Sequence, residues 1–389
     1  MKTKVIIRGL VLKVASRCNL NCEYCYMYNL GDKTYKSQPK VMSQEVVIHL
    51  LMRVKTYLTE SGSKTFAFIF HGGEPLLVGY DFYQNFVRKA NELLPASIQI
   101  IYTIQTNGVL LSDEWCKVLG SLGIRIGISL DGLSEEANRF RLDHHGRSSL
   151  SATLQGIANA QTSKHLKYLP GILSVINPNI NPDDLYKKYK SLKIRHINFL
   201  LPDGTHDNLP TGFELEQTIF ADWLIKLFDN WFEDQDRDKP QITFFNQILN
   251  KILGGEGDFE YLGGGKNINL IIETNGDIEP QDSLKACGNG FTKTNMNISN
   301  HALEDSFKHP LIKFCIDSQE TLCGQCQNCS VVEVCNGGFI THRYDAKNGF
   351  NNPSIYCKDL ERLIHYISIR VEYLLIYSSN KNIKGNEFF

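Results

Sequence analysis

Three cysteines near the start of the chain constrain it more than any other feature. Cys18, Cys22 and Cys25 form an amino-terminal triad with the spacing CxxxCxxC. A 4Fe–4S cluster that is bound by four thiolates serves to transfer electrons. Three thiolates on one short loop can hold such a cluster while its fourth iron stays open to a small molecule. The triad therefore predicts an iron–sulfur site at which a ligand binds directly to iron.

Disulfides and structural zinc are the alternative explanations for clustered cysteines. The chain has 389 residues and 11 Cys, and its first residues lead into a strand-like run without a signal peptide. No apolar stretch in the sequence has the length that spans a membrane. These features disfavour a disulfide scaffold, whereas zinc stays open as an alternative, above all for the later cysteines.

The composition fits an enzyme of the cytoplasm. Lys and Arg number 41 against 42 Asp and Glu, so a net charge of −1 gives no field that would gather nucleic acid or an anionic membrane. Because 11 cysteines need a reducing environment, we expect a cytoplasmic protein. Its partner is expected to be a particular ligand or peptide.

The amino-terminal half alternates β-rich runs with amphipathic helices. The expected strands are Val5–Val14, Thr65–Phe70, Ile98–Thr106, Arg125–Leu130, Leu169–Ile176 and His196–Leu201. The expected helices include Ser43–Glu60, Asp81–Leu94 and Ser112–Leu119. Such βα units in a row predict an α/β fold whose parallel sheet curls into a partial barrel. Active sites of such sheets lie at the carboxyl ends of the strands.

Short polar motifs fall at those strand ends. They are His71-Gly72-Gly73-Glu74-Pro75, Gln105-Thr106-Asn107-Gly108 and Ser129-Leu130-Asp131-Gly132. Each motif alone could also be a plain turn. Together with the triad, and with Tyr24 just before its last cysteine, they resemble the signature of radical S-adenosylmethionine (SAM) enzymes. The resemblance implies a partial (β/α)6 barrel of the TIM type, a 4Fe–4S cluster on the triad and SAM as cofactor or cosubstrate.

The same resemblance implies a set of residues around SAM. They are Tyr24, Gly72, Gly73, Glu74, Asn107, Ser129, Asp131 and Arg141. The two glycines permit close approach of the backbone to the methionine ammonium, whose charge Glu74 would pair. Short polar side chains suit the ribose hydroxyls and the methionine carboxylate. Arg141 would add a guanidinium for that carboxylate, although an Arg on a solvated helix face is an equal alternative.

A second group of cysteines occupies the carboxyl-terminal part of the chain. Its members are Cys287, Cys315, Cys323, Cys326, Cys329, Cys335 and Cys357. The last four resemble the SPASM extension of radical SAM enzymes that modify peptides and proteins, which implies an outer auxiliary 4Fe–4S cluster. That pattern expects one more cysteine where Phe339 stands. An inner auxiliary cluster would be bound by Cys287, Cys315 and Cys323. Cys323 could instead compete with Cys357 for the outer cluster. A zinc ribbon also fits the spacing of these cysteines.

Three further runs, 200–208, 337–344 and 348–357, look like the SPASM maturases that install cyclophane crosslinks in ribosomally made peptides. In those enzymes the adenosyl radical takes a hydrogen from a β-carbon, and the carbon radical joins an aromatic ring. Loss of an electron and a proton then restores aromaticity. For the base, Asp282 resembles in position the catalytic Asp of sulfatase-maturing relatives, although Gln281 stands where they have a cluster Cys. His206 and Asp207 are the alternative acid–base pair, and ordinary turns explain all three residues as well.

The sequence thus predicts a radical SAM oxidoreductase that forms a C–C crosslink in a ribosomally synthesised precursor peptide. Flavodoxin or ferredoxin would supply the electron. The rival hypotheses are formylglycine formation in a sulfatase, a thioether or ether crosslink, and a non-enzymatic iron–sulfur electron carrier. The expected organisation is a barrel over residues 1–210, a helical bridge over 211–266, a SPASM-like domain over 267–378 and a flexible tail over 379–389.

Overall fold

One mixed sheet organises the fold. The computed structural model describes residues 5–257, 259–264 and 268–385, and side chains as far as residue 376. The strands of the sheet follow the order β7-β6-β5-β4-β3-β2-β1-β8-β9. Their bounds are β1 (Ile7–Ala15), β2 (Thr65–Gly72), β3 (Gln99–Thr106), β4 (Arg125–Ser129), β5 (Gly171–Val175), β6 (His196–Leu200), β7 (Gln241–Ile242), β8 (Ile268–Ile272) and β9 (Ile278–Glu279).

The first six strands confirm the predicted α/β partial barrel. Each of β1 to β5 pairs in parallel with the next strand of the chain. β8 then pairs in parallel with β1, and only β9 runs antiparallel to its neighbour. Because parallel strands end at the same edge of the sheet, the motifs that follow β1 to β4 come together there.

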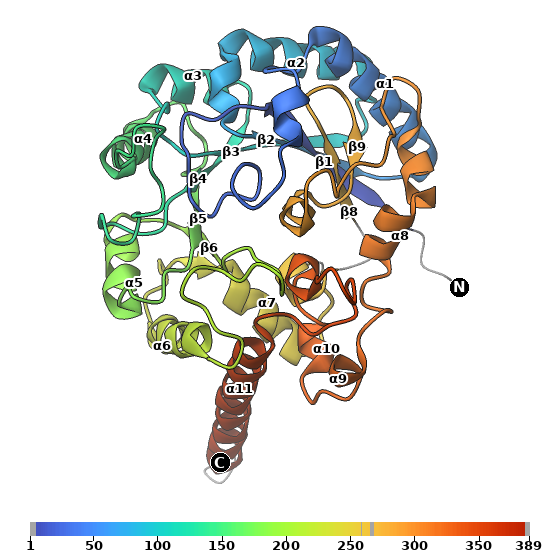
Figure 1. Cartoon of the computed structure of the whole chain (residues 1–389). Coiled ribbons are helices and arrows are strands. Elements are labelled where there is room, and N and C mark those ends of the chain that lie inside the picture. Colours follow the sequence, from blue (N-terminus) through green and yellow to red (C-terminus); the bar gives the residue numbers. More distant parts are fainter. Residues whose placement is uncertain (1–4, 258, 265–267, 386–389) are drawn as a thin grey trace.

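Helices surround the curved sheet (Figure 1). Their bounds are α1 (Gln44–Ser61), α2 (Tyr80–Leu93), α3 (Asp113–Ser121), α4 (Leu150–Thr162), α5 (Pro182–Ser191), α6 (Ile219–Glu233), α7 (Thr243–Ile252), α8 (Pro310–Ile316), α9 (Gly324–Gln327), α10 (Val332–Cys335) and α11 (Cys357–Gly385). The caps expected at two starts are present, since Ser43 accepts a hydrogen bond from the Val46 N–H and Ser112 accepts one from the Trp115 N–H.

Along the barrel strands, apolar side chains that pack against the outer helices alternate with side chains that face the interior of the barrel. Phe66, Phe68 and Phe70 of β2 are buried, and the last two meet Phe86 of α2 at ring-centroid distances of 5.1 and 5.0 Å. Successive side chains of a strand point to opposite faces, so His71 of the same strand faces the interior of the barrel. Polar groups thereby reach the inside of the barrel from strands that are anchored by aromatic packing outside.

The sheet runs across the domain boundaries expected from the sequence. β7 pairs with β6, and β8 pairs with β1, so the segments after residue 210 and after residue 266 both extend one sheet. The expected flexible tail, 379–389, is helical as far as Gly385, and residues 386–389 lie outside the described residues. Polar Lys and Asn side chains do not end a helix, whereas Gly385 favours an end.

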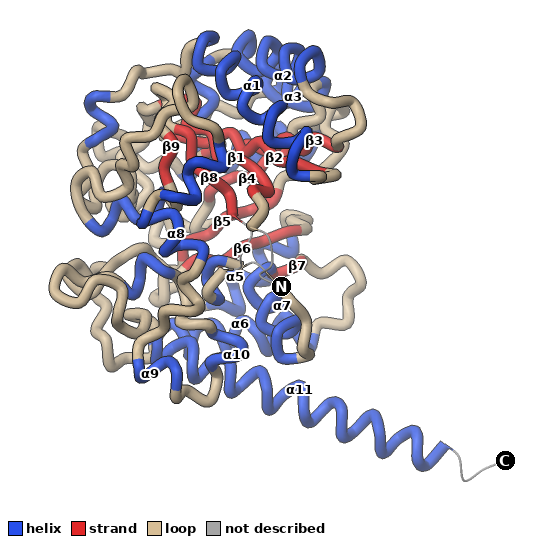
Figure 2. Tube along the Cα trace, turned by 90° about the vertical axis from the view of Figure 1, so that its right-hand side faces the viewer, coloured by secondary structure: helices blue, strands red, loops and turns tan. Residues whose placement is uncertain are grey.

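Helix α11 projects away from the body of the molecule (Figure 2). Over the described residues, no helix combines the length and apolar character needed to cross a membrane.

Candidate active site

A main cavity with a volume of about 510 Å³ lies at the carboxyl ends of the barrel strands. All three triad cysteines line it. It is also lined by Tyr24, Gly72, Gly73, Asn107, Ser129, Asp131, Arg141 and Asp282. Residues from five separate segments of the chain therefore line one cavity.

The triad lies in the loop that follows β1. The Cys25 N–H donates to the Cys22 carbonyl at 3.1 Å, and the Leu20 N–H donates to the Cys18 sulfur at 3.3 Å. Burial raises the pKa of all three thiols, that of Cys25 to about 12. A thiol must lose its proton to bind iron, so iron would have to displace these protons.

The cysteines are not gathered as they would be around a single ion. Within the described ranges, no group of three or more His, Cys, Asp or Glu could hold one metal ion. A 4Fe–4S cluster makes a different demand, because each thiolate binds its own iron at a separate corner of the cluster. Three sulfurs on the wall of one cavity fit that demand.

The two glycines after β2 allow the next turn to pack directly on the triad loop. A side chain at Gly72, whose φ is +131°, would place its Cβ 2.2 Å from the Ala15 carbonyl oxygen. A Cβ at Gly73 would lie 2.0 Å from the Tyr28 hydroxyl. Both approaches are far below van der Waals contact, so larger residues would push the loop and its cysteines out of place.

Glu74 does not line the main cavity, contrary to its expected place beside the SAM ammonium. Its carboxylate accepts hydrogen bonds from the Leu76 N–H at 2.9 Å, the Thr106 hydroxyl at 2.7 Å and the Asn107 N–H at 2.8 Å. These contacts join the ends of β2 and β3 beneath the cavity. The sequence showed a carboxylate at the right strand end, but the fold directs it toward the neighbouring backbone.

Arg141 presents buried hydrogen-bond donors that suit an anionic ligand. It is 4% exposed, lines the cavity and donates through Nη1 to the Tyr24 hydroxyl at 3.1 Å. That hydroxyl in turn donates to Asp131. The Nε and Nη2 atoms of Arg141 are buried and have no hydrogen-bond partner in the part of the chain that the structure describes. A carboxylate such as that of SAM would satisfy both donors.

Asn107 and Ser129 add polar groups to the same wall. The Asn107 amide donates to Asn19 of the triad loop at 2.7 Å, and Ser129 accepts from the Gln105 amide at 2.9 Å. Both residues line the cavity. All of the residues expected around SAM, Glu74 excepted, therefore line the main cavity.

A buried lysine that the sequence analysis missed meets the expected base. Lys13 of β1 is fully buried, and its ammonium pairs with the Asp282 carboxylate and lies 3.2 Å from His71 Nδ1. The Tyr26 hydroxyl also donates to Asp282, at 2.7 Å. The Asp282 side chain keeps 18% exposure toward the cavity. Although burial opposes ionisation, Lys13, the nearby His71 and the Tyr26 hydroxyl together hold the pKa of Asp282 well below its usual range.

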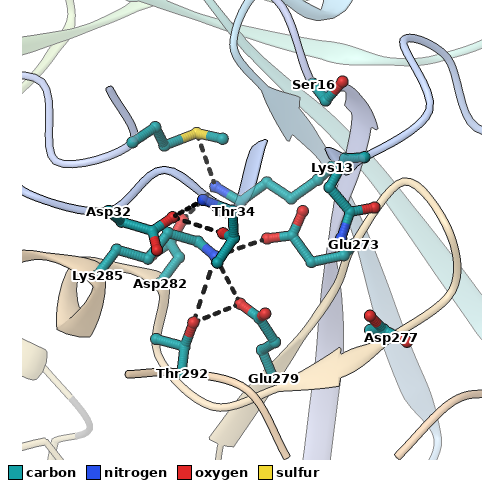
Figure 3. Close-up of polar contacts among 12 residues, drawn as sticks. Lys13, Ser16, Asp32, Thr34, Glu273, Asp277, Glu279, Asp282, Lys285 and Thr292 are labelled. Carbon is teal, nitrogen blue, oxygen red and sulfur yellow. Dashed lines mark hydrogen bonds and ion pairs between the residues drawn. The ribbon is translucent and has the colours of Figure 1, made fainter. Parts of the chain in front are cut away.

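A second buried lysine ties the segment after β9 to the strand pair β8–β9 (Figure 3). Lys285 contacts Glu279 at 2.7 Å and Glu273 at 3.0 Å, and all three are almost completely buried. On the other side, Asp32, which follows the triad, accepts from the Gly290 N–H at 2.8 Å. These contacts fix the segment around residue 287 against the loop that carries the triad.

The alternative acid–base pair lies outside the main cavity. His206 Nε2 lies 2.8 Å from the Pro353 carbonyl oxygen, and the Asp207 carboxylate accepts from the Ala346 N–H at 2.7 Å. Neither residue lines the cavity that holds the triad. Both side chains instead anchor the carboxyl-terminal segment to the loop after β6.

The later cysteines divide differently from the expected inner and outer sets. Cys326, Cys329, Cys335 and Cys357 line a second cavity of about 340 Å³. Cys323 precedes α9 and contacts Cys326, because residues three apart at a helix start share one side. We call these five cysteines the outer group. Cys287 and Cys315 interact with one another, and we assign Cys323 to the outer group because of its contact with Cys326.

Comparisons with known proteins agree with this arrangement. Residues 12–192 match the family model described as "Radical SAM superfamily". That range includes the triad and every residue expected around SAM. This chain is a radical SAM enzyme. SAM and 4Fe–4S clusters, one of them the radical SAM cluster, are therefore its cofactors.

The enzyme is similar to curated proteins over most of its length. It is 27% identical to a "Cysteine-type anaerobic sulfatase-maturating enzyme" of Clostridium novyi, over 90% of this chain and 92% of that protein. It is 26% identical to a "Serine-type anaerobic sulfatase-maturating enzyme" of Klebsiella aerogenes, over 87% of this chain and 81% of that protein.

Solved structures share its fold. "Native anSMEcpe with bound AdoMet" has a TM-score of 0.82 at 23% identity and covers 94% of this chain and 98% of that one. "Crystal structure of Streptococcus suis SuiB" has a TM-score of 0.57 at 18% identity, over 87% of this chain and 74% of that one. The fold of this chain, its carboxyl-terminal extension included, is thus shared with solved structures over most of its length.

Proposed function

We propose that the enzyme oxidises one residue of a peptide or protein, beginning with removal of a hydrogen atom from its β-carbon. The observation that carries the proposal is the meeting of the triad, the unpartnered Arg141 donors and the Lys13–Asp282 pair around one cavity. SAM bound to the cluster of the triad supplies a 5′-deoxyadenosyl radical. A small cofactor leaves part of a cavity of this size for a side chain of the substrate.

The residues of the chain have distinct tasks in this proposal. The triad would hold the radical cluster, and Arg141 with Tyr24 would fix the methionine end of SAM. The outer group would hold an auxiliary cluster, with four of its thiols around one cavity. A carboxylate of the main cavity would take the proton that the oxidised residue releases.

Two products begin with the same hydrogen removal. The similarity to cysteine-type and serine-type anaerobic sulfatase-maturating enzymes favours formylglycine, made from a Cys or Ser of a sulfatase. The sequence runs that resemble cyclophane maturases favour a C–C crosslink to an aromatic ring. Phe339 and Gln281, which stand where the related pattern has cluster cysteines, set this chain apart from that pattern. We retain the crosslink as the first candidate and formylglycine as the second.

Mass spectrometry of treated peptides distinguishes these products. Peptides encoded beside the gene, and synthetic peptides that carry one Cys or one Ser, would be incubated with reconstituted enzyme, SAM and a reductant such as flavodoxin. A crosslink removes two hydrogens and keeps every heavy atom, whereas formylglycine from Cys loses sulfur. Formylglycine from Ser also loses two hydrogens, but its aldehyde reacts with a hydrazide. Formation of 5′-deoxyadenosine without change in any peptide would contradict the proposal.

The location of the enzyme stays a prediction. We propose the cytoplasm, because the 11 cysteines require a reducing environment.

A further inference from the structure

A second carboxylate of the main cavity differs from Asp282 in its surroundings. Asp203 lies after the end of β6 and lines the cavity. Its side chain is 18% exposed, and its Oδ1 atom is buried without a hydrogen-bond partner among the described residues. A buried carboxylate oxygen that has no donor is costly, and a proton on the carboxyl group removes that cost.

An imidazole whose Nε2 atom also lacks a hydrogen-bond partner among the described residues lies close to that oxygen. His342 is fully buried, and its Nε2 atom lies 4.0 Å from Asp203 Oδ1 with no hydrogen bond in the described structure. The rings of Phe339 and Tyr356 pack against it at centroid distances of 5.0 and 4.8 Å. This burial lowers the pKa of His342 to about 3, so the ring is neutral.

The neutral ring has one orientation that fits its neighbours. The Pro202 backbone hydrogen-bonds to His342, which places the ring proton on the nitrogen that faces that carbonyl. The other nitrogen, Nε2, then presents a lone pair to Asp203. A lone pair repels an ionised carboxylate but accepts a hydrogen bond from a protonated one. His342 therefore stabilises the protonated form of Asp203.

The surroundings of Asp282 and Asp203 shift the pKa values of these two carboxylates in opposite directions. Asp282 pairs with Lys13 and is kept ionised, which makes it a weak base. Burial, together with the charges of Asp282 and Glu260, raises the pKa of Asp203 to about 7. The other titratable groups that face Asp203 are Tyr26, Tyr261, Tyr356, Cys287 and His342. Carboxylates separated in this way by their environments are suited to different roles.

We propose that Asp203 is the proton acceptor of the reaction and that His342 positions it by accepting a hydrogen bond from its protonated carboxyl group. The inference rests on the proposed function. In the crosslinking reaction, the ring C–H bond breaks and its proton passes to Asp203. The C–H electron pair restores the aromatic ring, and an oxidised iron–sulfur cluster held by the extension would accept the unpaired electron. In formylglycine formation, Asp203 takes the proton of the S–H or O–H group, the same kind of cluster would accept the unpaired electron, and a C=S or C=O double bond forms. For Cys, water then hydrolyses the C=S bond and releases hydrogen sulfide.

Asp203→Asn tests the assignment, with Asp359→Asn as the matched control. Asp359 is also buried, has one unpartnered oxygen and has its pKa raised to about 6, but it lies at the start of α11 outside the main cavity. The reconstituted holoenzyme should cleave SAM in both variants. With the peptide that the wild type modifies, Asp203→Asn should lower the yield of modified peptide per 5′-deoxyadenosine by about 10²-fold or more. The control should keep the wild-type ratio.

Two further measurements separate the proton acceptor from a merely structural residue. Infrared difference spectra of the holoenzyme between about pH 6 and about pH 8 should show protonated-carboxyl intensity from several buried carboxyl groups, Glu260 and Glu279 among them, and part of that intensity should be absent from Asp203→Asn. In His342→Gln, the new side-chain amide can donate a hydrogen bond to the ionised Asp203 carboxylate and so lower its pKa. The pH below which the yield of modified peptide per 5′-deoxyadenosine falls should therefore be lower in this variant than in the wild type. An unchanged ratio in Asp203→Asn, or infrared difference spectra that this substitution leaves unchanged, would overturn the assignment. If the wild type modifies no peptide, the proposed function fails, and the infrared result still decides the protonation of Asp203.

Discussion

The ion pair of Lys13 and Asp282 allows a quantitative test of how the main cavity is held together. Lys13→Met keeps the length of the side chain and removes its charge. The lysine is completely buried, so no water replaces the lost contact on its side. Removing one partner of a buried pair costs about 3–5 kcal/mol, because the other charge stays buried. Since Asp282 keeps 18% exposure, we expect the lower end, about 3 kcal/mol of unfolding free energy.

The double substitution Lys13→Met/Asp282→Asn should recover part of that loss. With both charges gone, no uncompensated carboxylate remains, so the two single losses should exceed the double loss by about 1 kcal/mol or more. Urea unfolding followed by tryptophan fluorescence, on variants matched for iron content, measures all three values. The pKa of Asp282 is lowered in the folded state, so the contribution of the pair is present above about pH 4 and lost as the pH falls further.

The reasoning would be refuted by strictly additive single losses at neutral pH. It would also be refuted if Lys13→Met lowered the unfolding free energy by less than about 1 kcal/mol. Either result would mean that solvent already screens Asp282 and that the pair does not organise the cavity.

Three further predictions concern the cofactor sites. Replacing the amino-terminal triad by Ala should abolish 5′-deoxyadenosine formation and leave iron in the extension, and wild-type SAM cleavage by that variant would contradict the triad's role. Arg141→Gln should weaken equilibrium SAM binding by about tenfold to a hundredfold, because charged hydrogen bonds contribute about 1.5–3 kcal/mol; unchanged affinity would assign the guanidinium to structure alone. Metal analysis of anaerobically reconstituted protein should find about eight irons per chain, because the inner set has only Cys287 and Cys315 and the outer group holds one auxiliary cluster. About twelve irons per chain, or bound zinc, would contradict this assignment of the cysteines.

The sequence predicted the parts of the structure that depend on local pattern. Strands β1 to β6 lie within two residues of their expected bounds at each end, because apolar alternation and turn residues mark them. The motif order after successive strands also predicted that most of these polar residues would line one cavity, since parallel strands end at one edge.

Contacts between distant segments could not be predicted. Lys13 is a charged residue in the apolar run 9–15, which signals a buried partner, but that partner is Asp282, 269 residues later. The pairing of Asp203 with His342 likewise joins two segments that no local pattern connects. The spacing of the cysteines also did not decide whether Cys323 belongs to the inner or the outer group. The position of Cys323 at the start of α9 places it beside Cys326.

Transfer of deuterium from the substrate tests the central claim most directly. A peptide that carries deuterium at the β-carbon of its modified residue would be incubated with the reconstituted enzyme, SAM and reductant. The account predicts that 5′-deoxyadenosine gains one deuterium and that modified peptide and 5′-deoxyadenosine form in equal amounts in the wild type. Unlabelled 5′-deoxyadenosine formed together with modified peptide would contradict removal of a β-hydrogen by the SAM-derived radical.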